Sequence, residues 1–188
     1  MSLLPLGILS QGGVAAPSSY ELISTTTLGA NATSVTFSSI VSTYSHLQIR
    51  AAARCDRSFG VDNLALRFNA DSTSNYNTHF LYNNGSTITS TDLGINTWIY
   101  SAYIPDSSVT ASVFGSAIID VLDYKATTKN KVIRSIYGSS TGGTYPRNGM
   151  NSGVWLSTNA ITSITLLPVA GTNLVSGSRF SLYGIKGS

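Results

Sequence analysis

The stretch Asn63–Tyr82, NLALRFNADSTSNYNTHFLY, indicates the fold class of this chain. Asn63–Phe68 alternates large apolar side chains with small or charged ones, which is the period-of-two pattern of a strand with one buried face. Asn69–Asn77 is rich in Asn, Asp, Ser and Thr and predicts a tight polar loop. Thr78–Tyr82 predicts a second strand. We therefore expect two strands joined by a polar hairpin loop at the centre of the chain.

Similar strand signals continue on both sides of this centre. Nine further strands are expected: Tyr20–Leu28, Ser34–Ile40, His46–Arg54, Thr97–Ile104, Val113–Tyr124, Lys131–Tyr137, Gly153–Ser157, Thr162–Pro168 and Arg179–Ile185. The apolar middle of Val113–Tyr124 predicts a central strand. Ser86–Asn96 and Ser139–Asn151 are expected to be surface loops. No stretch carries the apolar spacing of a helix, so the sequence predicts an all-β fold, either an antiparallel β-sandwich or a barrel.

The first residues differ from the remainder of the chain. Residues 1–19 predict an extended N-terminal arm on a flexible link, and residues 20–188 predict a single β-sandwich domain. The arm either folds back on its own domain or inserts into a partner, and we favour a partner. Its candidate partner-binding residues are Leu3, Leu4, Leu6, Ile8 and Leu9. The arm has no basic start and its apolar run is interrupted, so we expect neither a secretory signal nor a membrane span.

Composition excludes several classes of partner. Charged residues make up only 10% of the 188 residues, against about a quarter in an average protein. The net charge of +3 is too small for a nucleic-acid-binding face, so no nucleic-acid partner is expected.

Cys55 is the only cysteine and is expected in the core. Two groups of basic residues are expected at solvated strand ends and loops: Arg50, Arg54 and Arg57, and Lys125, Lys129 and Lys131.

The sequence shows no catalytic arrangement. His46 and His79 are expected to be packed or surface residues, and no serine lies in a nucleophile elbow. Asp120 and Asp123 are expected to face opposite sides of a strand, so they do not form the carboxylate pair of a glycosidase. We therefore expect no enzyme activity, no catalytic residue and no cofactor.

One spacing resembles a calcium loop. Asn69, Asp71, Thr73 and Asn75 place oxygen ligands at alternate positions. The loop lacks the glycine and the closing glutamate of an EF-hand, so a polar hairpin loop is the preferred interpretation and no metal site is expected.

Aromatic residues in the loops raise the possibility of glycan binding. Exposed tyrosines, or Trp98 or Trp155, would stack on sugar rings while nearby amides bind hydroxyl groups. The alternative is that these aromatic residues belong to the core or to subunit contacts. The candidate glycan-contacting or partner-contacting loop residues are Asn75, Tyr76, Tyr82, Tyr145 and Arg147.

Several motifs, in order, resemble small structural proteins of tailed bacteriophages. They are SSYELISTTTL, VTFSSI, YSHLQIRAAAR, LRFNADSTSNY, FGSAIIDVLDYKATTKNK, SGVWLSTNAITSITLLP and GSRFSLYGIKGS. The resemblance covers nearly the whole chain from residue 20 onward. It implies a virion component assembled in the host cytoplasm, such as a capsid decoration or cement protein or a part of a tail fibre or baseplate. It also implies an antiparallel, jelly-roll-like β-sandwich that assembles as a homotrimer, and it carries over no catalytic residue.

Three hypotheses follow. The first is a non-enzymatic capsid decoration or cement protein that binds the major capsid protein or another virion protein as a trimer, partly through its arm. The alternative is a tail-fibre or baseplate protein that binds host-surface glycan. The third, an enzyme such as a depolymerase, is disfavoured because no usable carboxylate pair is present.

Overall fold

The computed structural model describes residues 19–140 and 145–187, and within these ranges all regular structure is β-strand. The predicted arm residues Leu3, Leu4, Leu6, Ile8 and Leu9 lie outside the described residues. The strands are β1 (Tyr20–Thr27), β2 (Val35–Phe37), β3 (His46–Ala53), β4 (Val61–Phe68), β5 (Tyr76–Asn83), β6 (Ile88–Asn96), β7 (Ile99–Pro105), β8 (Gly115–Leu122), β9 (Lys131–Ser139), β10 (Arg147–Trp155), β11 (Ile164–Pro168) and β12 (Arg179–Ile185).

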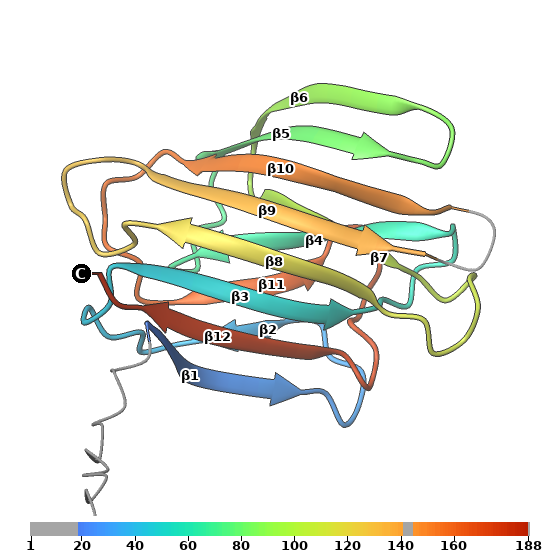
Figure 1. Cartoon of the computed structure of the whole chain (residues 1–188), viewed down its shortest axis with the longest axis horizontal. Coiled ribbons are helices and arrows are strands. Elements are labelled where there is room, and N and C mark those ends of the chain that lie inside the picture. Colours follow the sequence, from blue (N-terminus) through green and yellow to red (C-terminus); the bar gives the residue numbers. More distant parts are fainter. Residues whose placement is uncertain (1–18, 141–144, 188) are drawn as a thin grey trace, which may run out of the picture.

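The strands form two antiparallel sheets packed face to face. The larger has eight strands in the order β1-β12-β3-β8-β9-β10-β5-β6, and the smaller has four in the order β2-β11-β4-β7. Figure 1 views the larger sheet from outside, with the smaller sheet behind it. The predicted antiparallel β-sandwich is confirmed, as is the central position of the strand predicted at Val113–Tyr124, since β8 is the fourth strand of the larger sheet.

The strand pairing is that of a jelly roll. Four antiparallel pairs nest inside one another along the sequence: β1 with β12, β2 with β11, β3 with β8, and β4 with β7. The outermost pair and the β3–β8 pair lie in the larger sheet, and the other two pairs lie in the smaller one. Two four-stranded sheets built from one folded-over hairpin are the jelly-roll arrangement.

Two inserted hairpins extend this jelly roll at the β8 edge. The β5–β6 hairpin is inserted between β4 and β7, and the β9–β10 hairpin between β8 and β11. β9 pairs with β8, and β10 pairs with β5, so all four strands join the larger sheet. The extension doubles the width of the larger sheet, which then reaches well beyond the smaller one.

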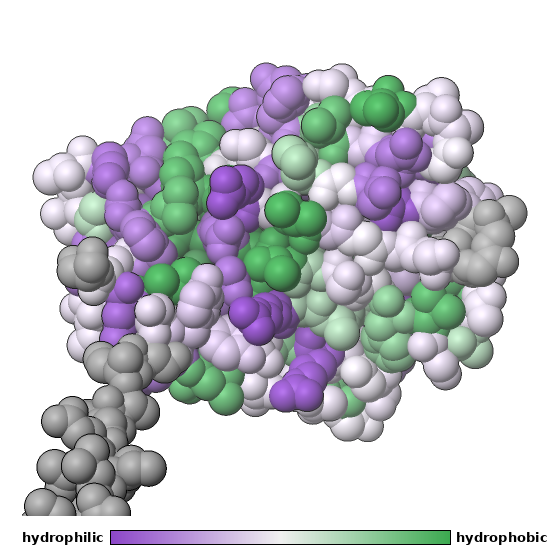
Figure 2. Space-filling view, viewed as in Figure 1, coloured by the Kyte–Doolittle hydropathy of each residue, from purple (hydrophilic) through white to green (hydrophobic). Residues whose placement is uncertain are grey.

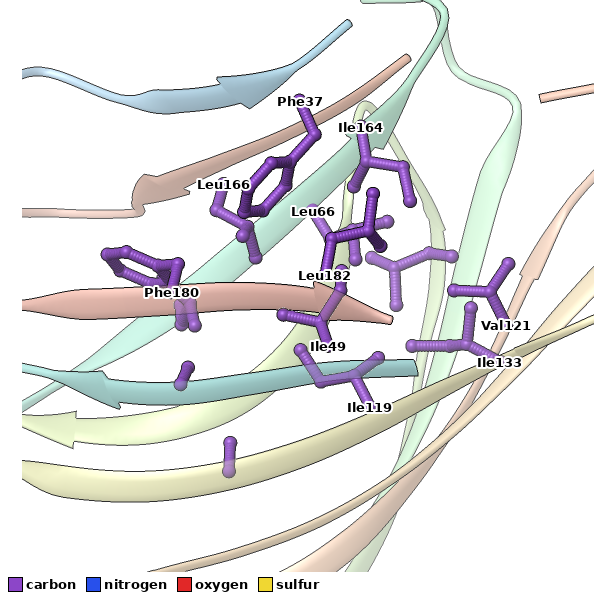
Figure 3. Packing of buried hydrophobic residues seen from close by; sticks show 14 of the residues in the cluster. Phe37, Ile49, Leu66, Ile119, Val121, Ile133, Ile164, Leu166, Phe180 and Leu182 are labelled. Atoms are coloured by element: carbon purple, nitrogen blue, oxygen red, sulfur yellow. The ribbon is translucent and has the colours of Figure 1, made fainter. Parts of the chain in front are cut away.

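The core lies between the two sheets. Ile49, Ile119 and Leu182 of the larger sheet face Leu66 and Leu166 of the smaller sheet, and each of these five side chains is 0% exposed (Figure 3). Cys55 is also fully buried, which confirms its predicted place in the core.

Three predictions about the chain path are wrong. The predicted loop Asn69–Asn77 is not a hairpin loop, because β4 lies in the smaller sheet and β5, which begins at Tyr76, lies in the larger. The connection therefore crosses between the sheets. The predicted loop Ser86–Asn96 contains β6, whose mostly polar side chains hid the strand. The predicted loop Ser139–Asn151 contains the first part of β10, which begins at Arg147. Its inward positions there hold Gly149 and Asn151, so the strand lacks the usual apolar alternation.

Two basic residues are not at solvated strand ends, contrary to prediction. Arg54 is 7% exposed, and its guanidinium donates to the carbonyl oxygens of Val109, Thr110 and Val113 at 2.7–3.1 Å. Lys131 is 0% exposed, and its ammonium donates to the carbonyl oxygens of Lys129 and Thr158. Both cations organise loops that flank the larger sheet.

Candidate functional site

The polar groups of the loop between β4 and β5 form hydrogen bonds within the protein. The Asp71 carboxylate accepts hydrogen bonds from the Thr73 amide at 2.9 Å, the Asn75 side chain at 3.1 Å and the Trp155 indole at 2.7 Å. Burial alone would raise the pKa of Asp71, but these hydrogen bonds outweigh it and hold the pKa well below its usual range. The loop is therefore fastened to β10 by its central carboxylate.

The other oxygen ligands of the calcium-like spacing are also engaged. The Asn69 Oδ1 atom accepts from the amides of Thr162 and Ser163 at 2.8 and 3.1 Å, which ties the loop to the segment before β11. Among the described residues, no three His, Cys, Asp or Glu side chains gather as a metal site would require. The side chains of Asn69 and Asp71 thus bond within the protein, in a loop that is polar as predicted but does not form the predicted hairpin.

Tyr76, predicted as a surface contact, is buried, so that prediction is wrong. Its ring is 0% exposed and stacks on Trp155 with ring centroids 6.3 Å apart. Its hydroxyl donates to the Asp71 carbonyl at 3.0 Å and accepts from the Phe68 amide at 3.1 Å. Burial raises the pKa of Tyr76 to about 12. The neighbouring Asn75 is partly buried.

Most of the remaining aromatic residues fill the space between the extension and β7. Tyr82 and Tyr103 lie edge to face 5.1 Å apart, and the Arg147 guanidinium lies 5.5 Å from each ring. Tyr137 is 4% exposed and its hydroxyl donates to Asn151. These residues hold the inserted hairpins on the jelly roll, as the alternative interpretation of a packing role proposed. Tyr145 is 43% exposed, so it stays available for contact.

The two histidines and most acids have structural partners. His46 Nδ1 accepts a hydrogen bond from the Asp123 backbone amide at 3.0 Å, and His79 Nε2 lies 3.1 Å from the Ser90 hydroxyl. The Asp106 carboxylate accepts the amides of Phe59 and Gly60, both at 2.7 Å. Burial alone would raise the pKa of Asp106, but hydrogen bonds from Ser108, Phe59 and Gly60 lower it. Such carboxylates shape loops and hold the chain together.

The outer face of the larger sheet carries an unusual row of apolar side chains, which we call the apolar row. Ile118 lies opposite Ile136, Ile136 opposite Met150, and Met150 opposite Leu81. The row crosses β8, β9, β10 and β5 in register, and its members are 45, 59, 49 and 39% exposed. The buried residues of these strands, such as Ile119 and Ile133, occupy the alternate positions, so the row points away from the core.

A polar row runs alongside the apolar row. It consists of directly opposed residues on five strands: Asp120, Arg134, Ser152, His79 and Asp92. Beyond it, Leu122, Val132 and Val154 form a second, shorter apolar line. Figure 2, which views this face, shows two hydrophobic bands separated by a hydrophilic one. Sequence periodicity gives the inward and outward positions of each strand but not which strands lie side by side, so the row could not be found before the topology was known.

Exposed apolar side chains also lie at both lateral edges of this face. Tyr20 and Leu22 on β1 are 44 and 55% exposed, and Ile88 and Ile95 on β6 are 74 and 55% exposed. Each lies opposite an outward residue of the neighbouring strand, which places it on the outer face. Large apolar surfaces left in water mark interaction sites. The outer face of the larger sheet is therefore the candidate functional site.

Comparisons with known proteins do not assign this chain to a family. No protein-family model and no curated protein matches the sequence. One solved structure, that of the infectious bursal disease virus Gt strain, aligns at 12% identity over 90% of this chain and 42% of that chain, with a TM-score of 0.12. This chain thus spans less than half of that protein, and the likeness is too slight to support an argument. Within the described residues, no helix is long and apolar enough to cross a membrane.

Proposed function

We propose that this chain is a non-enzymatic structural protein of a tailed-bacteriophage virion that decorates the capsid as a trimer and attaches partly through its N-terminal arm. One observation carries the proposal: an otherwise complete jelly roll exposes the in-register apolar row Ile118, Ile136, Met150 and Leu81. Fully burying a side chain of this size contributes about 1.5–3 kcal/mol. A face of this kind gains stability when another protein segment covers it.

The use of polar groups supports a binding role. The Asp62 carboxylate, 1% exposed, accepts hydrogen bonds from the backbone amides of Ala170 and Gly171. The Asp56 carboxylate accepts hydrogen bonds from the backbone amides of Thr172 and Asn173. These carboxylates brace loops within the fold, as Asp71 and Asp106 do. Because Cys55 is the only cysteine, these bonds brace the sandwich without an internal disulfide, which suits a protein assembled in a reducing cytoplasm.

The resemblance of the sequence to small phage structural proteins supports the same proposal. It names the class of partner, a capsid or other virion protein, and implies the trimer. Three copies joined in one trimer would bind a shell more tightly than a single copy, because the second and third contacts form within one complex.

Particle binding tests the proposal. Particles prepared without this protein are incubated with the full chain or with a chain lacking residues 2–17. Because the described strands all lie between residues 20 and 185, the shortened chain keeps every strand of the sandwich. We expect the full chain to saturate the particles and the shortened chain to bind at least tenfold more weakly. Full occupancy by the shortened chain would show that the arm is not the anchor.

The alternative function, glycan binding by a tail-fibre or baseplate protein, is favoured by one separate observation. A hollow of about 420 Å³ on the outer face is lined by Asn77, His79, Asp92 and Ser152, among others. The Asn77 Oδ1 atom is buried there and accepts no hydrogen bond from the described part of the chain. A glycan array probed with the full chain tests this function, and a binding signal lost in Asn77→Ala would support it.

A further inference from the structure

The outer face of the larger sheet combines three features that a single jelly roll does not need. They are the apolar row, the exposed apolar residues on β1, and those on β6 at the opposite edge. Within the described residues, β1 pairs only with β12 and β6 only with β5, so both lateral edges are open. An open edge with exposed apolar residues is a surface for another chain.

We propose that the occupant of the apolar row is the N-terminal arm of a second copy of this chain. The arm leaves the sandwich at Ser19, directly before β1, at the edge farthest from β6. If the β1 edge of one copy meets the β6 edge of the next, the arm emerges beside the neighbour's β5 and β6, where the apolar row ends at Leu81. This inference rests on the proposed function, because it assigns the arm a docking surface within the trimer.

The arm is long enough for this task. Residues 1–18 span up to about 60 Å when extended, at about 3.3 Å for each residue. A sheet of eight strands is about 34 Å wide, because neighbouring strands lie about 4.8 Å apart. The arm of one copy therefore reaches across the whole neighbouring row, and its Leu and Ile side chains supply apolar surface to match that of the row.

The two lateral edges favour a second copy over the chain's own arm. On its own chain, the arm would cross the outward side of β12 and β3, where Arg50 stacks over Tyr183 with its guanidinium 4.9 Å from the ring. That path would leave Ile88 and Ile95 on β6 uncovered. Contact between the β1 edge of one copy and the β6 edge of the next covers both sets of exposed residues. A repeated contact of this head-to-tail kind closes into a ring, such as a trimer, when the rotation permits.

Complementation between two full-length variants tests the proposal. The arm variant carries Leu4→Ser, Leu6→Ser and Ile8→Ser and keeps the apolar row. The row variant carries Ile136→Asp and Met150→Asp and keeps the arm. Sedimentation velocity over a range of concentrations reports association, and circular dichroism confirms that each variant is folded.

We expect the unmodified chain to form an oligomer and each variant alone to sediment as a monomer. An equal mixture of the two should form mixed oligomers, because the intact arm of one variant docks on the intact row of the other. A matched control carrying Ser116→Asp and Ser152→Asp adds the same charge to the same outer face outside the apolar row. This control should associate at least tenfold more tightly than the row variant.

Failure of complementation would overturn the inference, as would an unmodified chain that stays monomeric at every concentration. The proposed function is judged separately, by adding the same variants to particles. If the arm variant no longer binds particles but still forms its normal oligomer, the arm anchors the protein to the shell and does not dock on the row of a second copy. That outcome would overturn the inference and leave the proposed function standing.

Discussion

Ile136 on β9 lies directly opposite Met150 on β10, and both side chains point outward, 59 and 49% exposed. Three positions earlier on β9, Ile133 lies on the inner face at 2% exposure. Two isoleucines of the same strand therefore lie on opposite faces of the sheet: Ile133 packs in the core, and Ile136 belongs to the candidate site.

The first prediction compares these two isoleucines. Ile133→Ala should lower the free energy of unfolding by about 2–5 kcal/mol, because it leaves a cavity between the sheets. Ile136→Ala should change it by less than about 1 kcal/mol, because the side chain is already in water. Urea denaturation of both variants at low protein concentration measures the difference. Equal losses of stability would mean that the β9 register assigned here is wrong.

The second prediction concerns the packing between the sheets at Gly153. A Cβ atom at this position would clash with Ile99 Cγ2, so Gly153→Ala should cost about 1–3 kcal/mol. Ile99→Ala removes the obstructing atom. The loss of stability in the double variant should therefore be smaller than the sum of the two single losses. Strict additivity in a double-mutant cycle would argue against contact between these two residues.

The third prediction is a pH dependence centred on Asp71. Its folded-state pKa lies below the unfolded value of about 3.9, so its stabilising effect is present above about pH 4 and is lost as the pH falls toward the folded pKa. Asp71→Asn should lower stability at pH 7 by about 1–2 kcal/mol through weakened hydrogen bonds. It should also flatten the decline of stability below pH 4.

Urea unfolding at several pH values measures this effect. Asp92→Asn is the matched control, because Asp92 is exposed on the outer face. If Asp71→Asn had the same stability profile against pH as the unmodified chain, the hydrogen bonds from Thr73 and Trp155 to the Asp71 carboxylate would not stabilise the fold.

The fourth prediction concerns the buried Arg54, whose guanidinium binds three carbonyl oxygens between β7 and β8. Arg54→Lys should cost about 1–3 kcal/mol, because an ammonium group cannot satisfy the same three acceptors. It should also speed proteolysis within residues 106–114. Arg179→Lys, at an exposed position on β12, is the control and should leave both properties unchanged.

The sequence alone predicted the fold class and most strands, because their apolar residues alternate clearly. One strand and the first part of another were hidden for a physical reason. β6 has mostly polar side chains at a sheet edge, and the first inward positions of β10 hold Gly149 and Asn151 in place of large apolar residues. Alternation also says nothing about which sheet a strand joins. The loop at Asp71 was therefore taken for a hairpin, although it crosses between the sheets.

The candidate site was less predictable than the fold. Tyr76 was predicted as a surface contact, but it lies in the interior because it occupies an inward position of β5 and stacks on Trp155. The apolar row arises from residues on four strands, and only the strand order β8-β9-β10-β5 brings them together. Tyr145 is exposed, whereas Arg147 is partly buried on β10 against Tyr82 and Tyr103. The predicted contacts of these two residues and of the arm stay predictions.

The central claim is that this protein decorates the capsid shell, and its copy number in the virion tests that claim most directly. Quantitative mass spectrometry of purified particles measures the molar ratio of this protein to the major capsid protein. We expect a ratio near one, or a simple fraction of one such as a third. A handful of copies per particle would contradict shell decoration and would place the protein on the tail, where binding of a host glycan becomes the leading function.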